Sequence, residues 1–343
     1  MTVKQTLSWR GGFVLLACIG VAAAGCSSSS SSKTPSGGSS HSSSSAAKPS
    51  GTANVAYASS IEFLNEKSFG PAFEKAEGFK YSGQAGASGE LEADIAGGEI
   101  SPNVFESVGG DNITPLEPKF TKWYVQYATT SIVLAYNPKS KYASQFKAIA
   151  SGKEPLSKLY PLLATPGFKL GRTDPNIDPQ GRAFIYMLEL AQMKYHLPSS
   201  IVTKILGGPL ADAKSPEVFA EASLESTLQS GQLDASSAYQ NQAIELHLPY
   251  ITLPDDINLS NPADAANYAK AHITITGNVA KTGSPLAIDI TTIGTPTPAA
   301  TAFVKYVLSP AGLALYKQGG YRLLKPALTG TGAPSAITSE LGG

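Results

Sequence analysis

The sequence predicts an α/β fold in which helices cover a parallel β-sheet. Three short segments that predict strands, each followed by a small polar loop and a helix-forming stretch, occur at Asn54–Ala58, Lys80–Ser82 and Val104–Ser107. This alternation of strand, loop and helix is typical of parallel sheets. The globular part has about 290 residues, a length at which chains tend to divide into two lobes.

The second half of the sequence continues the alternation. Phe184, Met187, Leu188 and Ala191 recur at helical spacing and predict a helix with one buried face. Residues 123–136 predict one long strand or a pair of strands. The remaining predicted elements are a helix at 142–150, strands or loops at 236–239 and 250–253, strands at 271–276 and 286–293, and helices at 299–308 and 311–318.

A secretory signal precedes Cys26. Lys4 and Arg10 stand before an apolar run at 13–24 that is too short to span a bilayer, and Ala-Ala-Gly comes directly before the cysteine. This junction resembles the lipobox of bacterial lipoproteins, in which the thiol is lipidated and becomes the new N-terminus. The alternative is an ordinary cleaved signal with an incidental cysteine. We expect a signal peptide at 1–25 and a lipid anchor on Cys26.

The segment 27–52 is rich in Ser, Gly, Pro and Ala and has almost no large apolar residues. Such a composition buries too little surface to offset its ordering entropy, so it predicts a flexible linker. We therefore expect a membrane-anchored domain on the extracytoplasmic face of the cell membrane.

Charge and cysteine content exclude several classes of function. Loss of residues 1–25 removes Lys4 and Arg10 from 26 basic residues and none of the 26 acidic ones, which leaves a formal charge of −2. No Lys/Arg cluster of the kind that nucleic acid requires is present. Cys26 is the only cysteine outside the signal, so neither a disulfide framework nor a cysteine-based metal site is expected.

Polar side chains follow the predicted strands of the first half. Ser59, Ser60, Ser88 and Ser107 stand at strand ends, where ligands bind in open α/β sheets. A second polar segment, Gly171–Arg182, has the sequence GRTDPNIDPQGR and ends where a helix begins. Its two Asp-Pro steps predict a rigid loop, and helix N-termini favour anions. The alternative is a well-capped turn with no ligand.

The GRTDPNIDPQGR segment resembles the loop of the tungstate/molybdate-binding lipoproteins of ABC importers, which carry DPN-x-DP-x-G before a helix. The resemblance extends over residues 54–326. It includes the two serine loops at 58–60 and 87–88, and WY…IVLAY at 123–136. It also includes YITLP…INL at 250–259 and an ending at 303–312 that is typical of extracellular solute-binding proteins.

The resemblance implies a two-lobed periplasmic-binding-protein (Venus flytrap) fold with two interlobe crossovers. Lobe I would comprise 53–126 and 288–330, and lobe II 127–287. A tungstate or molybdate ion would lie in the cleft as cargo of an ABC permease and ATPase, and the protein would be a monomer. The residues that the resemblance assigns to the ligand are Ser59, Ser60, Ser88, Asp174, Pro175, Asn176 and Tyr239.

One position departs from the family pattern. In the family, a glutamate just before the tyrosine joins the aspartate at the metal centre of the anion, and the corresponding residue here is Ala238. Either the anion is bound in simple tetrahedral form, or the ligand has changed. Asp174 has three possible roles: it bonds the Mo or W centre, it accepts a hydrogen bond from a protonated oxyanion, or it faces away and caps the loop.

Catalysis is not expected. The four histidines form no zinc-type spacing, no G-x-S-x-G elbow is present, and the Gly86–Gly89 turn lacks the lysine of a phosphate-binding loop. No cofactor is expected. The alternatives to a tungstate or molybdate importer component are the same fold with sulfate, phosphate or a small organic anion, and an anchored receptor without a transport role.

Overall fold

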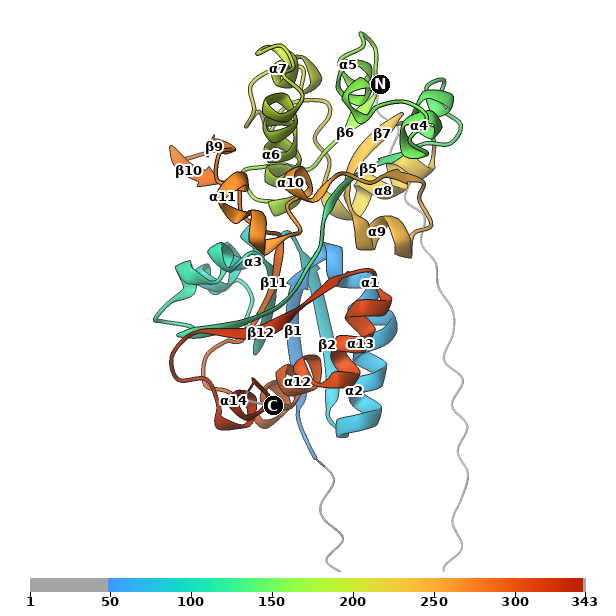
Figure 1. Cartoon of the computed structure of the whole chain (residues 1–343). Coiled ribbons are helices and arrows are strands. Elements are labelled where there is room, and N and C mark those ends of the chain that lie inside the picture. The colour runs from blue at the N-terminus through green and yellow to red at the C-terminus, as the bar shows by residue number, and fades with distance from the viewer. Residues whose placement is uncertain (1–48, 342–343) are drawn as a thin grey trace, which may run out of the picture. The chain divides into compact units, whose positions relative to one another are not determined.

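Two β-sheets organise residues 49–341, the part of the chain that this computed structural model describes. One sheet has six strands in the order β12-β4-β11-β3-β1-β2, and the other has four in the order β6-β7-β5-β8. They occupy the lower and upper parts of Figure 1. The predicted signal peptide, the lipidation site Cys26 and most of the predicted linker lie outside the described residues.

The six-stranded sheet is mixed. β1 pairs in parallel with β2 and β3, as the alternation of strands and helices predicts. β11 runs antiparallel between β3 and β4, and β12 runs antiparallel beside β4, so parallel pairing covers only half of the sheet. The strands are β1 (Thr52–Ala58), β2 (Lys80–Gly86), β3 (Val104–Val108), β4 (Trp123–Thr129), β11 (Ala287–Thr292) and β12 (Arg322–Gly330).

The chain crosses between the sheets twice. The predicted strand segment 123–136 is a pair, β4 and β5, whose members belong to different sheets. The chain returns to the first sheet at β11. The division into lobes at residues 126/127 and 287/288 stays a prediction. The other strands are β5 (Ile132–Tyr136), β6 (Leu170–Gly171), β7 (Ala235–Tyr239), β8 (Tyr250–Ile251), β9 (His272–Ile275) and β10 (Val279–Thr282), the last two forming a separate ribbon.

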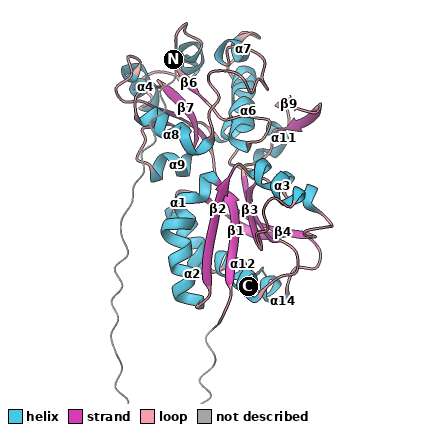
Figure 2. Ribbon diagram, turned by 180° about the vertical axis from the view of Figure 1, so that it is seen from behind, coloured by secondary structure: helices cyan, strands magenta, loops and turns pink. Residues whose placement is uncertain are grey.

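Helices cover both sheets (Figure 2). Those that lie around the six-stranded sheet in Figure 1 are α1 (Glu62–Leu64), α2 (Gly70–Glu77), α3 (Ser88–Gly97), α12 (Pro298–Leu308), α13 (Pro310–Gln318) and α14 (Ser335–Leu341). The rest are α4 (Ala143–Ala150), α5 (Leu159–Leu163), α6 (Pro179–Lys194), α7 (Ile201–Ile205), α8 (Glu221–Gln229), α9 (Gln240–Glu245), α10 (Asp255–Asn258) and α11 (Ala265–Tyr268). Within residues 49–341 no single helix is long and apolar enough to cross a membrane; only the bent pair α12–α13 meets the length and composition criteria together.

Helix α6 fixes the loop that precedes it. The predicted stripe of Phe184, Met187, Leu188 and Ala191 is buried, which confirms that face as core. Pro179 occupies the first turn, where a missing N–H costs nothing. A Cβ atom on Gly181 would lie 2.5 Å from the Thr173 carbonyl oxygen, so the close approach of helix and loop requires glycine there.

Candidate functional site

The strand-end serines lie at one edge of the six-stranded sheet. Ser59 and Ser60 follow β1, and Ser88 follows β2 as the first residue of α3, where we predicted a turn. Because β1 and β2 are parallel neighbours, these residues come together. The Ser88 Oγ atom accepts a hydrogen bond from the Val108 amide at 3.1 Å, so this hydroxyl is tied to the end of β3.

Ser60 is buried, and its hydroxyl makes no hydrogen bond within residues 49–341. Its backbone oxygen is engaged, since it accepts from Asn241 Nδ2 at 2.7 Å and from the Tyr321 hydroxyl at 3.3 Å. A buried hydroxyl without a partner costs about 1–3 kcal/mol. An anion oxygen next to Ser60 would remove that cost.

The segment between β6 and α6 is a network of side-chain turns. Asp174 Oδ1 accepts from the Asn176 amide at 2.9 Å and from Asn176 Nδ2 at 2.6 Å. Asp178 caps α6, because its Oδ1 atom accepts from the Gln180 amide at 2.8 Å. A protein carboxylate therefore already occupies the helix N-terminus at which the sequence predicted an anion.

Asn176 and Pro175 support this loop. The Asn176 Oδ1 atom accepts from the Thr276 amide and hydroxyl, both at 2.8 Å, and the Pro175 carbonyl accepts from Arg182 Nη1 at 3.2 Å. The same guanidinium reaches Asn112 Oδ1 at 3.4 Å, across to the six-stranded sheet side. The predicted contacts of Pro175 and Asn176 with an anion stay predictions.

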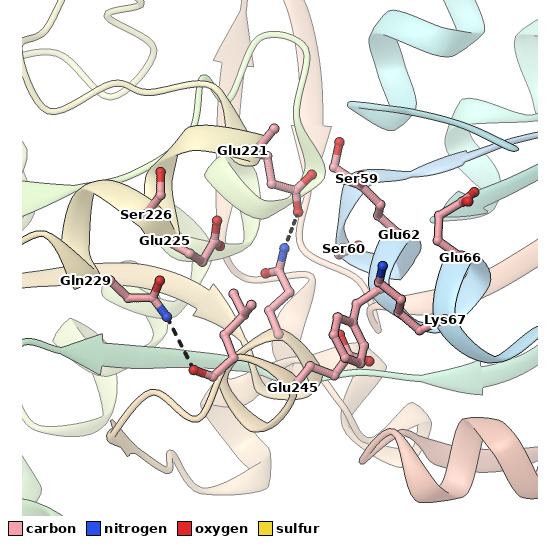
Figure 3. Close-up of a pocket in the computed structure, with 14 residues that line it drawn as sticks. Ser59, Ser60, Glu62, Glu66, Lys67, Glu221, Glu225, Ser226, Gln229 and Glu245 are labelled. Carbon is pink, nitrogen blue, oxygen red and sulfur yellow. Dashed lines mark hydrogen bonds between the residues drawn. The ribbon is translucent and has the colours of Figure 1, made fainter.

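Two cavities of about 420 Å³ each flank Ser59. The first, here the loop-side cavity, is lined by residues that include Ser59, Glu90, Asp174, Asp178 and Glu221. The second, the helix-side cavity, opens between α1 and α8 and appears in Figure 3. Its lining includes Ser59, Ser60, Glu62, Glu66, Lys67, Glu221, Glu225 and Glu245. Ser59 and Glu221 line both cavities and thus mark where they adjoin.

Glu221 is a functional candidate that the sequence comparison missed. It is the first residue of α8, is 6% exposed, and shares the loop-side cavity with Asp174. Burial, followed by the negative charges of Asp178 and Glu225, raises the pKa of Glu221 well above its ordinary value. Burial likewise raises the pKa of Asp178 to about 6 and that of Glu225 to about 7.

Tyr239 ends β7 and N-caps α9. Its hydroxyl is buried and has no hydrogen-bond partner within the described part of the chain. Burial, and then the charges of Asp178 and Glu221, raise the pKa of Tyr239 well above its usual range. The phenol is therefore a neutral donor beside the carboxylates.

Ala238 lies on the opposite side of β7 from the cleft. It is fully buried in an apolar cluster with Val133, Leu224 and Leu233. The neighbouring Ser237 hydroxyl instead donates to Gln180 Oε1 at 2.8 Å, as strand alternation requires. A carboxylate at position 238 would point into packed core, so the alanine there does not deprive the cleft of a carboxylate.

Replacing Ser60 with alanine is expected to weaken oxyanion binding about tenfold, because a hydrogen bond to a charged group contributes about 1.5–3 kcal/mol. Isothermal titration calorimetry measures the loss. Ser107→Ala is the matched control, since the Ser107 hydroxyl donates to the Gly109 carbonyl at 3.1 Å and lines neither cavity. Equal losses in both variants would show that Ser60 has no special contact with the anion.

Two lobes joined by two crossovers, with Ser59 on one side of a shared cavity and Asp174 and Glu221 on the other, define a solute-binding protein of the flytrap class. The family model of the bacterial extracellular solute-binding proteins matches residues 53–322. The chain belongs to that family.

Individual relatives agree with this assignment. The chain is 29% identical over 297 residues to the molybdate/tungstate-binding protein WtpA of Pyrococcus abyssi, which covers 79% of this chain and 83% of the relative. It is 30% identical to the protein of the same name from Thermococcus kodakarensis, over 65% of this chain and 66% of the relative. The periplasmic molybdate-binding protein of Azotobacter vinelandii shares the fold, with a TM-score of 0.55, 18% identity and coverage of 79% and 99% of the two chains.

Proposed function

We propose that this protein captures tungstate or molybdate in the cleft between its lobes and delivers it to an ABC permease and its ATPase. The observation that carries the proposal is the pairing of Ser59, from the β1 end, with Asp174 and Glu221 across one cavity. Two relatives named as molybdate/tungstate-binding proteins support the choice of anion. Binding and release, with no catalytic step and no cofactor, make up the activity.

Donors and carboxylates have different tasks in this site. Serine hydroxyls and the Tyr239 phenol donate to the oxo groups, and such charge-assisted bonds are about twice as strong as neutral ones. Carboxylates repel an ordinary dianion, but they can bond a Mo or W centre that accepts further ligands. Asp174 and Glu221 together supply the carboxylate pair. Two of the three roles of Asp174 have support. Its Oδ1 atom accepts two hydrogen bonds from Asn176, which is loop capping. Asp174 also lines the loop-side cavity, which favours a bond to the metal centre of the anion.

Replacing Asp174 with asparagine is expected to weaken tungstate and molybdate binding about tenfold or more, a loss of about 1.4 kcal/mol or more. Sulfate and phosphate binding should not weaken, because the repelling charge is gone. Asparagine keeps the acceptor for the Asn176 amide. Asp212→Asn is the matched control: its Oδ1 atom caps the Lys214 amide in a similar turn outside both cavities.

Calorimetric titration of the protein with tungstate, molybdate, sulfate and phosphate at equal ionic strength tests the proposal. Tight binding of the two metal oxyanions with weak binding of sulfate supports it. If neither metal oxyanion binds, the proposal is rejected, and sulfate, phosphate and organic anions become the candidate ligands. If none of these binds either, the remaining alternative is an anchored receptor without a transport role.

The anchoring of the protein is part of the proposal. The sequence around Cys26 supports a lipid anchor on the extracytoplasmic face of the membrane, with residues 27–52 as a linker to the binding domain. The family is one of extracellular proteins, which is consistent with that location. Mass spectrometry of the protein from its membrane fraction would detect the lipid on Cys26, and an unmodified thiol would reject the anchor.

A further inference from the structure

Two buried glutamine side chains hold one oxygen of the Glu221 carboxylate. Gln242, from α9, donates from Nε2 to Glu221 Oε1 at 2.9 Å, and Gln180, from α6, donates to the same atom at 3.3 Å. Figure 3 shows the bonded carboxylate of Glu221. Gln180 is fully buried, and Gln242 is 7% exposed. Three helices thus meet at a single carboxylate oxygen.

The two amides are themselves oriented by fixed donors. The Ser237 hydroxyl donates to Gln180 Oε1 at 2.8 Å, and the Tyr239 amide donates to Gln242 Oε1 at 3.1 Å. Gln180 Nε2 also donates to Gln242 Oε1, at 2.9 Å. Turning the Gln242 amide over would place its NH₂ group against the Tyr239 amide N–H, and turning the Gln180 amide over would place its carbonyl oxygen against Gln242 Oε1. The network therefore allows only one orientation, in which both NH₂ groups face Glu221.

The hydrogen bond from Gln242 acts on the pKa of Glu221 in the opposite direction to burial and the neighbouring charges. Burial and the nearby carboxylates of Asp178 and Glu225 favour the neutral acid, whereas the Gln242 amide favours the ionised form. Both amides use Oε1, so Oε2 is left for a ligand in the cavities that Glu221 lines. A carboxylate oxygen held in a fixed direction is what a metal-centred oxyanion requires of its ligand.

We infer that Gln180 and Gln242 are positioning residues of the oxyanion site, which hold Oε1 of Glu221 so that Oε2 is aimed at the metal centre of the anion. By this means they select tungstate and molybdate over sulfate, which has no use for a carboxylate ligand. The inference rests on the proposed function. It assigns a role to two residues that touch Glu221 rather than the anion.

The first test needs no ligand. Carbon-13 NMR follows the titration of the Glu221 carboxyl, assigned by the signal that Glu221→Gln removes. Gln242→Leu is expected to raise the pKa of Glu221 by about one unit or more, since a donor to the ionised form is lost. Gln229→Leu is the control, because Gln229 lines the same helix-side cavity but donates to the Leu246 carbonyl. An unchanged titration in Gln242→Leu would overturn the inference.

The second test is a double-mutant cycle read out by tungstate affinity. Gln242→Leu is expected to weaken tungstate binding about 10–100-fold, as supporting residues of metal sites do. In the Glu221→Gln background the same change should cost no more than about twofold, because the two residues act as one unit. Sulfate affinity should also stay within about twofold. Additive losses would mean that Gln242 only supports the fold.

A second variant protects the tests against a folding defect, since Gln242 also accepts a hydrogen bond from the Tyr239 amide at the start of α9. Gln180→Leu reaches Glu221 from a different helix and should shift the Glu221 titration and the tungstate affinity in the same directions. Thermal midpoints of the ligand-free variants identify any that are unfolded. Failure of the wild-type protein to bind tungstate or molybdate overturns the proposed function and the selectivity claim. The NMR titration still decides whether the amides hold Glu221.

Discussion

Replacing Gly89 with alanine is expected to weaken tungstate binding about 30–100-fold while leaving the ligand-free protein almost as stable as before. Gly89 is the second residue of α3, and its amide donates to the Ile177 carbonyl at 3.1 Å. A Cβ atom there would lie 2.5 Å from that carbonyl oxygen. Overpacking and the lost hydrogen bond together cost about 2–3 kcal/mol.

This free-energy cost opposes closure of the two lobes, because Gly89 and Ile177 belong to opposite sides of the cleft. The serine loop at 87–88 and the loop before α6 approach each other only where glycine lets their backbones touch. Without ligand, the lobes can relieve the clash by separating, so the thermal midpoint should hardly move. With ligand, the clash opposes binding. Calorimetry gives the affinity, and small-angle scattering shows whether the variant still closes.

Gly97→Ala is the matched control, since Gly97 ends the same helix and a Cβ there would meet only the Glu99 side chain, at 3.9 Å. Its tungstate affinity should equal that of the wild type. Wild-type affinity in Gly89→Ala as well would mean that the contact between the two sides does not contribute to binding.

Replacing Asp289 with asparagine is expected to stabilise the protein at pH 8 by about 5 kcal/mol and at pH 5 by less than about 2 kcal/mol. Asp289 is fully buried in β11, opposite Ser107 of β3 and Gln126 of β4. Burial raises its pKa from 3.8 to about 8, although Gln126 opposes the shift. The folded protein therefore holds a proton that the unfolded chain has lost at neutral pH.

The sign follows from proton linkage. Between pH 3.8 and about 8 the folded state binds more protons at Asp289 than the unfolded state does, so stability falls as pH rises. The slope is about 1.4 kcal/mol per pH unit, and its sum over this window is on the order of 5 kcal/mol. Asparagine resembles the protonated acid and does not titrate, so it removes this contribution.

Thermal unfolding at pH 5 and pH 8 measures the difference between Asp289→Asn and the wild type. Burial also raises the pKa of Glu106, to about 7, so part of the pH dependence should remain in the variant. Glu77→Gln, on the exposed end of α2, is the control and should change neither midpoint. Destabilisation of Asp289→Asn at both pH values would show that the buried carboxyl is ionised in the folded protein.

Local signals in the sequence predicted much of this fold. Short strand-like segments followed by serine predicted β1, β2 and the position of Ser60. The helical spacing of Phe184 and its neighbours predicted α6. Pairing between distant strands has no such signal, so the antiparallel insertion of β11 between β3 and β4 was not predicted. β12 was missed as well, because its residues are mostly exposed and include proline and glycine, which strands disfavour.

The candidate site was predicted in part, for a similar reason. Motif order located Asp174 and the serine loops, because each lies in a distinctive local segment. Glu221 lies in a stretch with no such pattern and reaches the cleft only through the packing of α8. The family glutamate corresponds to Ala238 by motif order, and strand alternation directs the side chain at that position into the core.

The division of chemistry across the cleft has a consequence for the timing of binding. Hydroxyls follow the strands of the six-stranded sheet, whereas Asp174 and Glu221 stand on the other side. Under the proposed function, any tetrahedral oxyanion that arrives at the serines meets the same donors, whatever element is at its centre. Discrimination begins only when the carboxylates close over it. Capture rates should therefore be similar among such anions, and their residence times should differ. Under the proposed function, the protein distinguishes anions by their dissociation rates rather than by their association rates.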